Sequence, residues 1–289
     1  MSIIEKAMEK ARQGSAQSPE AVQPRVVPQP ASQSTPQSAW QSAPEAVASD
    51  KGRDSTNNLV RIDPVPELVM CQPQTASLGG SYRLLKERLL AIRKEKPDMN
   101  LFMISSSMRA EGKTVVSANL AAAMALEFDH TVLLVDADLR APSCHKMFGI
   151  PGRPKGLADC LLYDVPFSDV VMRMDLGKLS LLCAGSATEN PSELFTSNRM
   201  QNFLLEIKHR YPDRIIIIDT VPLLPFAESR ALTRVVDGIV LVVREKVTAK
   251  AHLESTLRVL DGRPLLGIAY NGSSSYGADK EIFELVYGY

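Results

Sequence analysis

The sequence predicts an α/β fold with a doubly wound, mostly parallel sheet and helices on both of its faces. Short apolar runs alternate with helical patterns over the last two thirds of the chain, which is typical of such a sheet. Three of the runs, LFMIS, TVLLV and IIII, are continuously apolar, as expected for strands that are buried on both faces. The predicted strands are 101–105, 131–135, 179–183, 215–218, 239–243 and 265–269, and the predicted helices are 81–93, 112–126, 192–211, 229–235 and 250–261.

A short helix and a polar linker are predicted to precede this domain. Residues 1–12 contain a capping box, Ser2 with Glu5, and an apolar stripe at helical spacing. Because so few turns are not stable alone in water, the segment is expected either to lie on a partner, a membrane surface or its own domain, or to fray. Residues 13–76, rich in Gln, Pro and Ser, are predicted to form a disordered tether. The main domain then covers 77–275, and residues 276–289 form a C-terminal tail.

Composition excludes several classes of protein. Basic and acidic residues balance at 33 each, so no overall field attracts nucleic acid, and no nucleic-acid partner is expected. The cysteines Cys71, Cys144, Cys160 and Cys183 form no C-x-x-C pair; their spacing suits neither a zinc site nor a disulfide framework and favours reduced thiols. No apolar run approaches the ~20 residues of a membrane span, and no signal-peptide core is present. A cytoplasmic protein is expected.

A candidate phosphate-binding loop follows the first apolar strand. Strand, loop, Gly-Lys-Thr and helix succeed one another around Gly112, Lys113 and Thr114, which is the context of a phosphate loop. Backbone N–H groups and the helix N-terminus are expected to hold the phosphates, with Lys113 at the β/γ oxygens and the Thr114 hydroxyl on Mg²⁺. The strict pattern has glycine where this chain has Ser107. The predicted nucleotide-binding residues here are Ser107, Met108, Arg109, Ala110, Glu111, Gly112, Lys113, Thr114 and Val115.

Acidic residues end two of the predicted strands. Alternation places Asp136, Asp138 and Arg140 on one face if the strand stays extended, and doubly wound folds bind ligands at such strand ends. The alternative is a solvated strand exit. Four isoleucines lead into Asp219, the Walker B pattern, whose acid lies near Mg²⁺.

These motifs resemble those of the bacterial tyrosine kinases, P-loop proteins of exopolysaccharide and capsule production. The segment LLVDADLRAPSCHKMFG resembles their second Walker motif, and the resemblance covers about residues 80–289. It implies a P-loop NTPase fold of the deviant-Walker, partitioning-ATPase-like type. The N-terminal helix and tether resemble stand-alone autokinases of exosortase and exopolysaccharide systems. Further matching residues are Gly156-Leu157-Ala158-Asp159, Asn190-Pro191-Ser192-Glu193-Leu194, Asp219, Asp237-Gly238, Gly267 and Asn271.

The resemblance implies an ATP-dependent protein-tyrosine autokinase that uses Mg²⁺. Lys113, Asp136, Asp138 and Asp219 are the implied catalytic residues, with Mg²⁺ held by Thr114, Asp136 and Asp219, and Asp136 polarising the tyrosine hydroxyl. Asn271 is an implied nucleotide contact, and Arg140 an accessory residue. The implied phosphate acceptors are Tyr276, Tyr287 and Tyr289, whereas Tyr270 ends a strand and is expected in the core. A tail tyrosine that docks as a hydrophobic plug is the alternative.

The resemblance also implies partners, and the chain departs from the family pattern at several positions. The cytoplasmic segment of a membrane polysaccharide co-polymerase is the implied activator, which would place the protein peripherally at the inner face of the plasma membrane, and tail-to-site contacts imply self-association. The family loop commonly has Pro-Gly where this chain has Arg109-Ala110, and a Cβ at 110 could crowd a phosphate or oppose a positive φ. The family's assembly helix has Glu, Arg and Arg where this chain has Gly80, Arg83 and Lys86. The alternatives are a partitioning-type ATPase switch and a degenerate nucleotide-binding scaffold.

Overall fold

The structure, a computed structural model, describes residues 59–72 and 76–272. The predicted helix at 1–12, most of the predicted tether and the tail that contains Tyr276, Tyr287 and Tyr289 lie outside the described residues.

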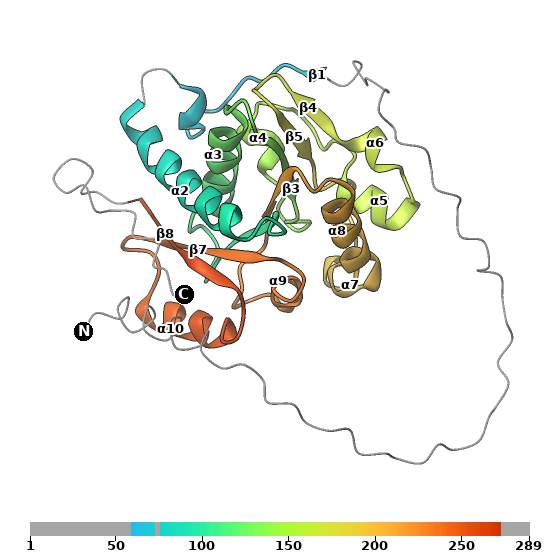
Figure 1. The fold of residues 1–289 in the computed structure, drawn as a ribbon. Coiled ribbons are helices and arrows are strands. Elements are labelled where there is room, and N and C mark those ends of the chain that lie inside the picture. Colours follow the sequence, from blue (N-terminus) through green and yellow to red (C-terminus); the bar gives the residue numbers. More distant parts are fainter. Residues whose placement is uncertain (1–58, 73–75, 273–289) are drawn as a thin grey trace, which may run out of the picture.

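In the described part of the chain, an eight-stranded sheet forms the centre of the fold (Figure 1), with the order β1-β4-β5-β3-β6-β2-β7-β8. Neighbouring strands are parallel except for the antiparallel pair β4 and β5, so the predicted mostly parallel sheet is confirmed. The strands are β1 (Leu59–Val60), β2 (Leu101–Ser106), β3 (Thr131–Asp136), β4 (Met172–Met174), β5 (Leu179–Leu182), β6 (Arg214–Asp219), β7 (Gly238–Arg244) and β8 (Leu265–Asn271).

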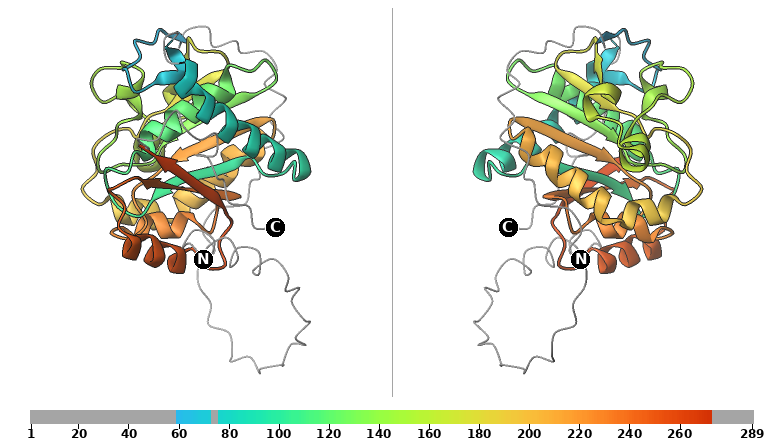
Figure 2. Two further views of the ribbon diagram at one scale, coloured as in Figure 1. Left: turned by 90° about the vertical axis from the view of Figure 1, so that its left-hand side faces the viewer. Right: turned by 90° about the vertical axis from the view of Figure 1, so that its right-hand side faces the viewer.

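Helices cover both faces of the sheet (Figures 1 and 2). Side chains alternate along β2: Phe102 packs with Leu85 and Leu89 in one core, and Met103 packs with Leu204 in the other. Burial on both faces explains why the central strands are uninterrupted apolar runs. The helices are η2 (Val69–Cys71), α2 (Ala76–Glu95), α3 (Lys113–Ala125), α4 (Cys144–Met147), α5 (Leu157–Tyr163), α6 (Phe167–Val170), α7 (Pro191–Thr196), α8 (Asn198–Arg210), α9 (Ala227–Leu232) and α10 (Lys250–Val259).

The helix predicted at 192–211 is two helices, α7 and α8. Ser197 between them has an extended backbone, with φ −66° and ψ 151°, and its side chain accepts a hydrogen bond from the Met200 N–H at 3.2 Å. A serine hydroxyl that satisfies a free N–H at a helix start is a common N-cap, so a new helix begins there. The helix predicted at 229–235 begins and ends earlier, as α9.

The predicted tether boundary at residue 76 is wrong. Residues 59–72 pack onto the domain: β1 pairs with β4, Leu68 is fully buried, and the Met70 N–H donates to the Asn119 side chain at 3.1 Å. Strands β1 and β4 were not predicted, because two or three residues are too few to show a periodic pattern.

On α2, Lys86 is directed into its own chain. It is 7% exposed and forms ion pairs with Glu127 and, at 3.0 Å, with Glu87. Gly80 of the same helix is exposed.

Candidate active site

Strand β6 brings together the residues on which the candidate site depends. It lies between β3 and β2, so its last residue, Asp219, is paired in register with Asp136 at the end of β3 and with Ile104 of β2, just ahead of the phosphate loop. Asp136 and Asp219 are both fully buried. The carboxyl end of the sheet is where open α/β sheets bind their ligands.

The phosphate loop between β2 and α3 has two residues with positive φ. Gly112, at the N-cap of α3, has φ 93°, and a Cβ built there would lie 2.0 Å from Nδ2 of Asn271. Only glycine therefore fits at this position. Ala110 has φ 62°, so the expected conflict between its Cβ and a left-handed backbone is real, and such a conformation costs an alanine about 1 kcal/mol.

Contacts from β7, from β8 and from the segment between β7 and α10 support the phosphate loop. Glu111 is fully buried, and its carboxylate accepts the Met108 N–H at 2.9 Å and the Thr248 hydroxyl at 2.6 Å. Nδ2 of Asn271 donates to the Glu111 carbonyl at 3.0 Å, and the Arg244 guanidinium donates to the Ala110 carbonyl at 2.8 Å. The Met108 N–H and the Glu111 and Asn271 side chains thus hold the loop in shape.

Lys113 begins α3 and is 7% exposed. Thr114 and Ser117, one turn further along α3, donate to the two carboxylate oxygens of Asp219 at 2.7 and 3.0 Å. Burial raises the pKa of Asp219, while Lys113, Thr114 and Ser117 act in the opposite direction. Asp219 is therefore held in one orientation beside the only lysine of the loop.

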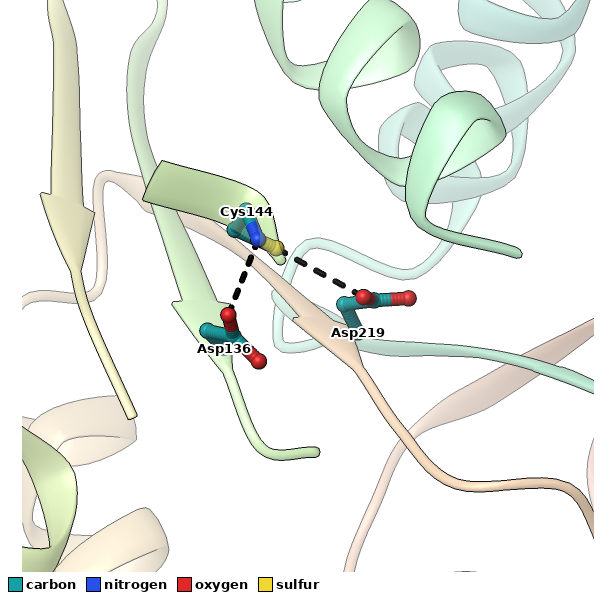
Figure 3. A group of neighbouring side chains, drawn as sticks. All are labelled: Asp136, Cys144 and Asp219. Carbon is teal, nitrogen blue, oxygen red and sulfur yellow. Dashed lines mark hydrogen bonds between the residues drawn. The ribbon is translucent and has the colours of Figure 1, made fainter. Parts of the chain in front are cut away.

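Backbone amides hold Asp136. Its carboxylate accepts N–H groups from Asp138 at 3.1 Å, Ser143 at 3.0 Å and Cys144 at 2.9 Å, and Figure 3 shows it facing Cys144, with Asp219 beyond the sulfur. Burial, and then the charge of Asp219, raises the pKa of Asp136 to about 7. Two carboxylates buried this close together are costly without a cation.

Asp136, Asp138 and Arg140 were expected to share one strand face only if the strand stayed extended, and this condition is not met, because β3 ends at Asp136. The Asp138 carboxylate turns back to accept the Ala141 N–H at 2.9 Å. Arg140 forms an ion pair with Glu228 at 2.7 Å, and its guanidinium lies 4.8 Å from the ring centre of Phe226.

Arg109 of the phosphate loop also stacks on Phe226, with its guanidinium 5.0 Å from the centre of the ring. Both arginines are exposed. They stack on the same ring beside the loop, and Arg140 is in addition neutralised by its ion pair with Glu228. Met108 and Val115 are partly buried, and Ser107 is fully buried.

The donor atoms at this centre fit a divalent cation. Carboxylate oxygens from Asp136 and Asp219 and the Thr114 hydroxyl are oxygen ligands of the type that Mg²⁺ prefers. The hydroxyl of Thr114 already lies 2.7 Å from an oxygen of Asp219 and accepts from the Ser143 hydroxyl at 3.1 Å. The predicted metal residues thus lie together.

Sequence reasoning missed several residues of the site. Ser117 lies one helical turn after Thr114, and this spacing could have indicated it. Ser143 and Cys144 follow Asp136 by seven and eight residues, and only the turn of the chain into α4 brings their N–H groups to its carboxylate. Thr248 and Thr256 have no sequence signal, because they reach the phosphate loop from a part of the chain that is distant in sequence. Conversely, Asp159 and Asp237 are held in structural contacts: Asp159 accepts the Gly156 N–H at 2.7 Å, and Asp237 accepts the Leu101 N–H at 2.9 Å.

Fold and loop define a P-loop nucleotide-binding domain of the α/β class. A family model described as an AAA domain matches residues 103–261, more than half of the chain. The chain is 31% identical over 218 residues to tyrosine-protein kinase YwqD of Bacillus subtilis, which covers 73% of this chain and 89% of YwqD. The chain therefore belongs to the bacterial tyrosine-protein kinase family, and the predicted family is confirmed.

Other relatives agree. Putative tyrosine-protein kinase CapB of Staphylococcus aureus is 26% identical over 68% of this chain and 85% of CapB. The solved kinase domain of Escherichia coli tyrosine kinase ETK is 27% identical, with a TM-score of 0.64 over 74% of this chain and 82% of that domain. The match to the curated E. coli Etk spans 79% of this chain but only 31% of Etk's length.

Proposed function

We propose that the protein is an ATP-dependent protein-tyrosine autokinase that phosphorylates its own C-terminal tail. Membership in the tyrosine-protein kinase family supports the reaction class. The single observation that supports the site is the register pairing of Asp136 with Asp219 beside the phosphate loop. The two buried carboxylates lie side by side in this pairing, and Thr114 is hydrogen-bonded to Asp219 at 2.7 Å. With Lys113 they would surround the γ-phosphate and its metal.

The residues of the loop bind and orient ATP. Lys113 places its positive charge against the β/γ oxygens, and the N-terminus of α3 contributes unpaired N–H groups. Asn271 and Arg244 keep the loop in position through the Glu111 and Ala110 carbonyls. Such fixed positive charges act on the charge that develops in phosphoryl transfer without reorganising.

The carboxylates serve the metal and the acceptor. Asp136, Asp219 and the Thr114 hydroxyl would hold Mg²⁺, and Asp136 would accept the proton of the attacking tyrosine hydroxyl. Bound Mg²⁺ neutralises charge on the transferring phosphoryl group. Asp138, anchored on the Ala141 N–H, adds negative charge at the same end of the sheet.

The tail tyrosines Tyr276, Tyr287 and Tyr289 are the proposed acceptors, because they are concentrated in the last residues of the chain. Each phosphate adds about −1.5 to −2 charge at pH 7. A phosphorylated tail is repelled by Asp136, Asp138 and Asp219, so autophosphorylation would weaken an assembly in which one subunit's tail enters the next subunit's site.

Regulation of exopolysaccharide synthesis or export belongs to the same proposal. The activating partner would be the cytoplasmic segment of a membrane polysaccharide co-polymerase, which would hold the kinase at the inner face of the plasma membrane. Among the described helices, none is both long and apolar enough to cross a bilayer. Membrane attachment would come from the partner and from the predicted segment at 1–12.

The test is incubation of the full chain with Mg·ATP, with and without a candidate partner peptide, followed by mass spectrometry. Phosphate is expected on Tyr276, Tyr287 or Tyr289, and the triple Tyr→Phe variant should bind ATP and form no phosphotyrosine. Tyr163→Phe is the matched control, since Tyr163 is 66% exposed outside the tail. ATP hydrolysis without tail modification would contradict the autokinase and support the ATPase switch.

A further inference from the structure

Cys144 lies at the candidate metal site, although the sequence did not predict it as a metal ligand. It is the first residue of α4, is fully buried, and its Sγ lies 3.5 Å from Oδ2 of Asp219. Asp136, Cys144 and Asp219 each offer one ligand atom, and these three atoms lie within 4.8 Å of one another (Figure 3). In the described part of the chain, this is the one group of three potential metal ligands that lie so close together.

The sulfur is not needed to hold either carboxylate. Both oxygens of Asp219 already accept hydroxyl groups, from Thr114 and Ser117, and Asp136 is held by backbone N–H groups. A thiol is a weak hydrogen-bond donor, so its contact with Asp219 adds little to the orientation of that side chain. Its position instead gives the centre a third ligand of a different chemical type.

We propose that Asp136, Cys144 and Asp219 form a site for a thiophilic divalent cation, Zn²⁺ or Cd²⁺, which competes with Mg²⁺ for the same two carboxylates. Mg²⁺ binds oxygen and gains nothing from sulfur. Zn²⁺ accepts thiolate and carboxylate together, and three protein ligands leave its fourth position open. The site thus selects between metals by whether sulfur takes part.

Binding exchanges one bond for another. The S–H bond of Cys144 breaks, a bond from sulfur to the metal forms, and the proton passes to the buffer, as is usual when metals bind thiols. No electron is transferred. The three negative ligands exceed the charge of the metal by one, and Lys113, whose charge acts on Asp219, offsets the excess.

The consequence is a metal-inhibited state of the centre. A thiophilic ion bound to Asp136 and Asp219 occupies the oxygens that the proposed function assigns to Mg²⁺, so the inference shares those two residues with the proposed function. It does not require that the chain phosphorylate anything. Metal binding is measured without ATP, so the two proposals can fail separately.

The experiment is a CdCl₂ titration of the nucleotide-free full chain, followed by the ultraviolet absorption of the thiolate–Cd²⁺ bond. One Cd²⁺ per chain is expected, and Cys144→Ala should bind Cd²⁺ at least about tenfold more weakly, with Cys144→Ser as a nearly isosteric second variant. Cys183→Ala is the matched control, because Cys183 is equally buried but belongs to no group of ligands. Excess Mg²⁺ should reduce the signal in the wild type.

An unchanged Cd²⁺ signal in Cys144→Ala, or its loss in Cys183→Ala alone, would overturn the proposal. Failure of Mg²⁺ to compete would overturn the shared use of the carboxylates. X-ray absorption of the wild type loaded with one equivalent of Zn²⁺ needs no variant that must fold. One sulfur with oxygen neighbours is expected, and a shell of oxygen and nitrogen alone would exclude Cys144 as a ligand.

Discussion

The hydroxyl groups of Ser107 and Thr256 are hydrogen-bonded to each other, 2.8 Å apart, and both residues are fully buried. Ser107 occupies the position where the strict phosphate-loop pattern has glycine. The Ser107 hydroxyl is directed toward α10. The side chain that stands in place of glycine is therefore accommodated by Thr256, which is distant in the sequence.

Breaking this pair should destabilise the fold. Thr256→Val leaves the Ser107 hydroxyl buried without its partner, which costs about 1–3 kcal/mol. Adding Ser107→Ala to Thr256→Val should cost less than the sum of the single changes, because the Ser107 hydroxyl that Thr256→Val leaves unpaired is then absent, whereas the Thr256 hydroxyl in Ser107→Ala still donates to the His252 carbonyl at 2.9 Å. Urea unfolding of the four proteins measures the coupling. Thr233→Val is the control, since the Thr233 hydroxyl donates only to a carbonyl of its own helix turn, at 2.7 Å; simple additivity would contradict the prediction.

Ala110→Gly should stabilise the protein by up to about 1 kcal/mol. Its φ of 62° strains any residue with a Cβ, and the strain exceeds the entropy that glycine adds to the unfolded chain. ATP affinity should also rise if the Cβ crowds a phosphate. Ala251→Gly, at an exposed position of α10, is the control of opposite sign, with an expected loss of about 1 kcal/mol. A destabilised Ala110→Gly protein would contradict the strain.

Lys113→Met should abolish phosphotyrosine formation and weaken ATP binding, while circular dichroism shows an intact fold. The change removes the buried positive charge at the start of α3 that is proposed to meet the β/γ oxygens. Lys250→Met, on an exposed lysine that begins α10, should leave both properties unchanged. Wild-type ATP affinity in a folded Lys113→Met protein would rule out the phosphate-loop role.

Asp136→Ala and Asp219→Ala should each lower Mg²⁺-dependent turnover by at least ~10²-fold, the scale of losing a positioned catalytic group. Nucleotide binding should suffer less, because the loop itself stays intact. Asp213→Ala is the control, since Asp213 is exposed and lies outside the site. The test measures initial rates of phosphotyrosine formation over a series of Mg²⁺ concentrations. Wild-type rates in both variants would show that neither acid takes part in catalysis.

Mg²⁺ should raise the melting temperature more at about pH 8 than at about pH 5.5. Burial and the charge of Asp219 raise the pKa of Asp136 from 3.8 to about 7, so the folded state binds this proton more tightly than the unfolded chain does. The contribution of Asp136 to stability is therefore greatest below about pH 4 and falls as the pH rises to about 7.

Mg²⁺ and the proton compete for the Asp136 carboxylate. Mg²⁺ therefore stabilises the folded protein more at a pH at which this carboxylate is ionised. In Asp136→Asn, which has no proton to lose, the pH dependence of the Mg²⁺ effect should shrink. An equal thermal shift at both pH values in the wild type would contradict a raised pKa at this residue.

Local pattern was enough to predict the central strands and the loop. The strands β2, β3 and β6 are recognisable because burial on both faces demands an unbroken apolar run, and α3 because Gly-Lys-Thr follows β2 after a short loop. Local pattern could not place β1 or β4, or the break at Ser197. Those features depend on a neighbouring strand or on one side-chain hydrogen bond.

The sequence by itself determined the family and the parallel α/β architecture. It also identified Lys113, Asp136 and Asp219 as site residues to test, because each belongs to a motif of a few consecutive residues. Only the tertiary structure decided what surrounds them. Spacing along the chain argued against any cysteine metal site, yet the insertion of β6 between β3 and β2 places Asp219 against Asp136 and beneath the sulfur of Cys144. Strand order is a property of long-range packing, and no local pattern encodes it.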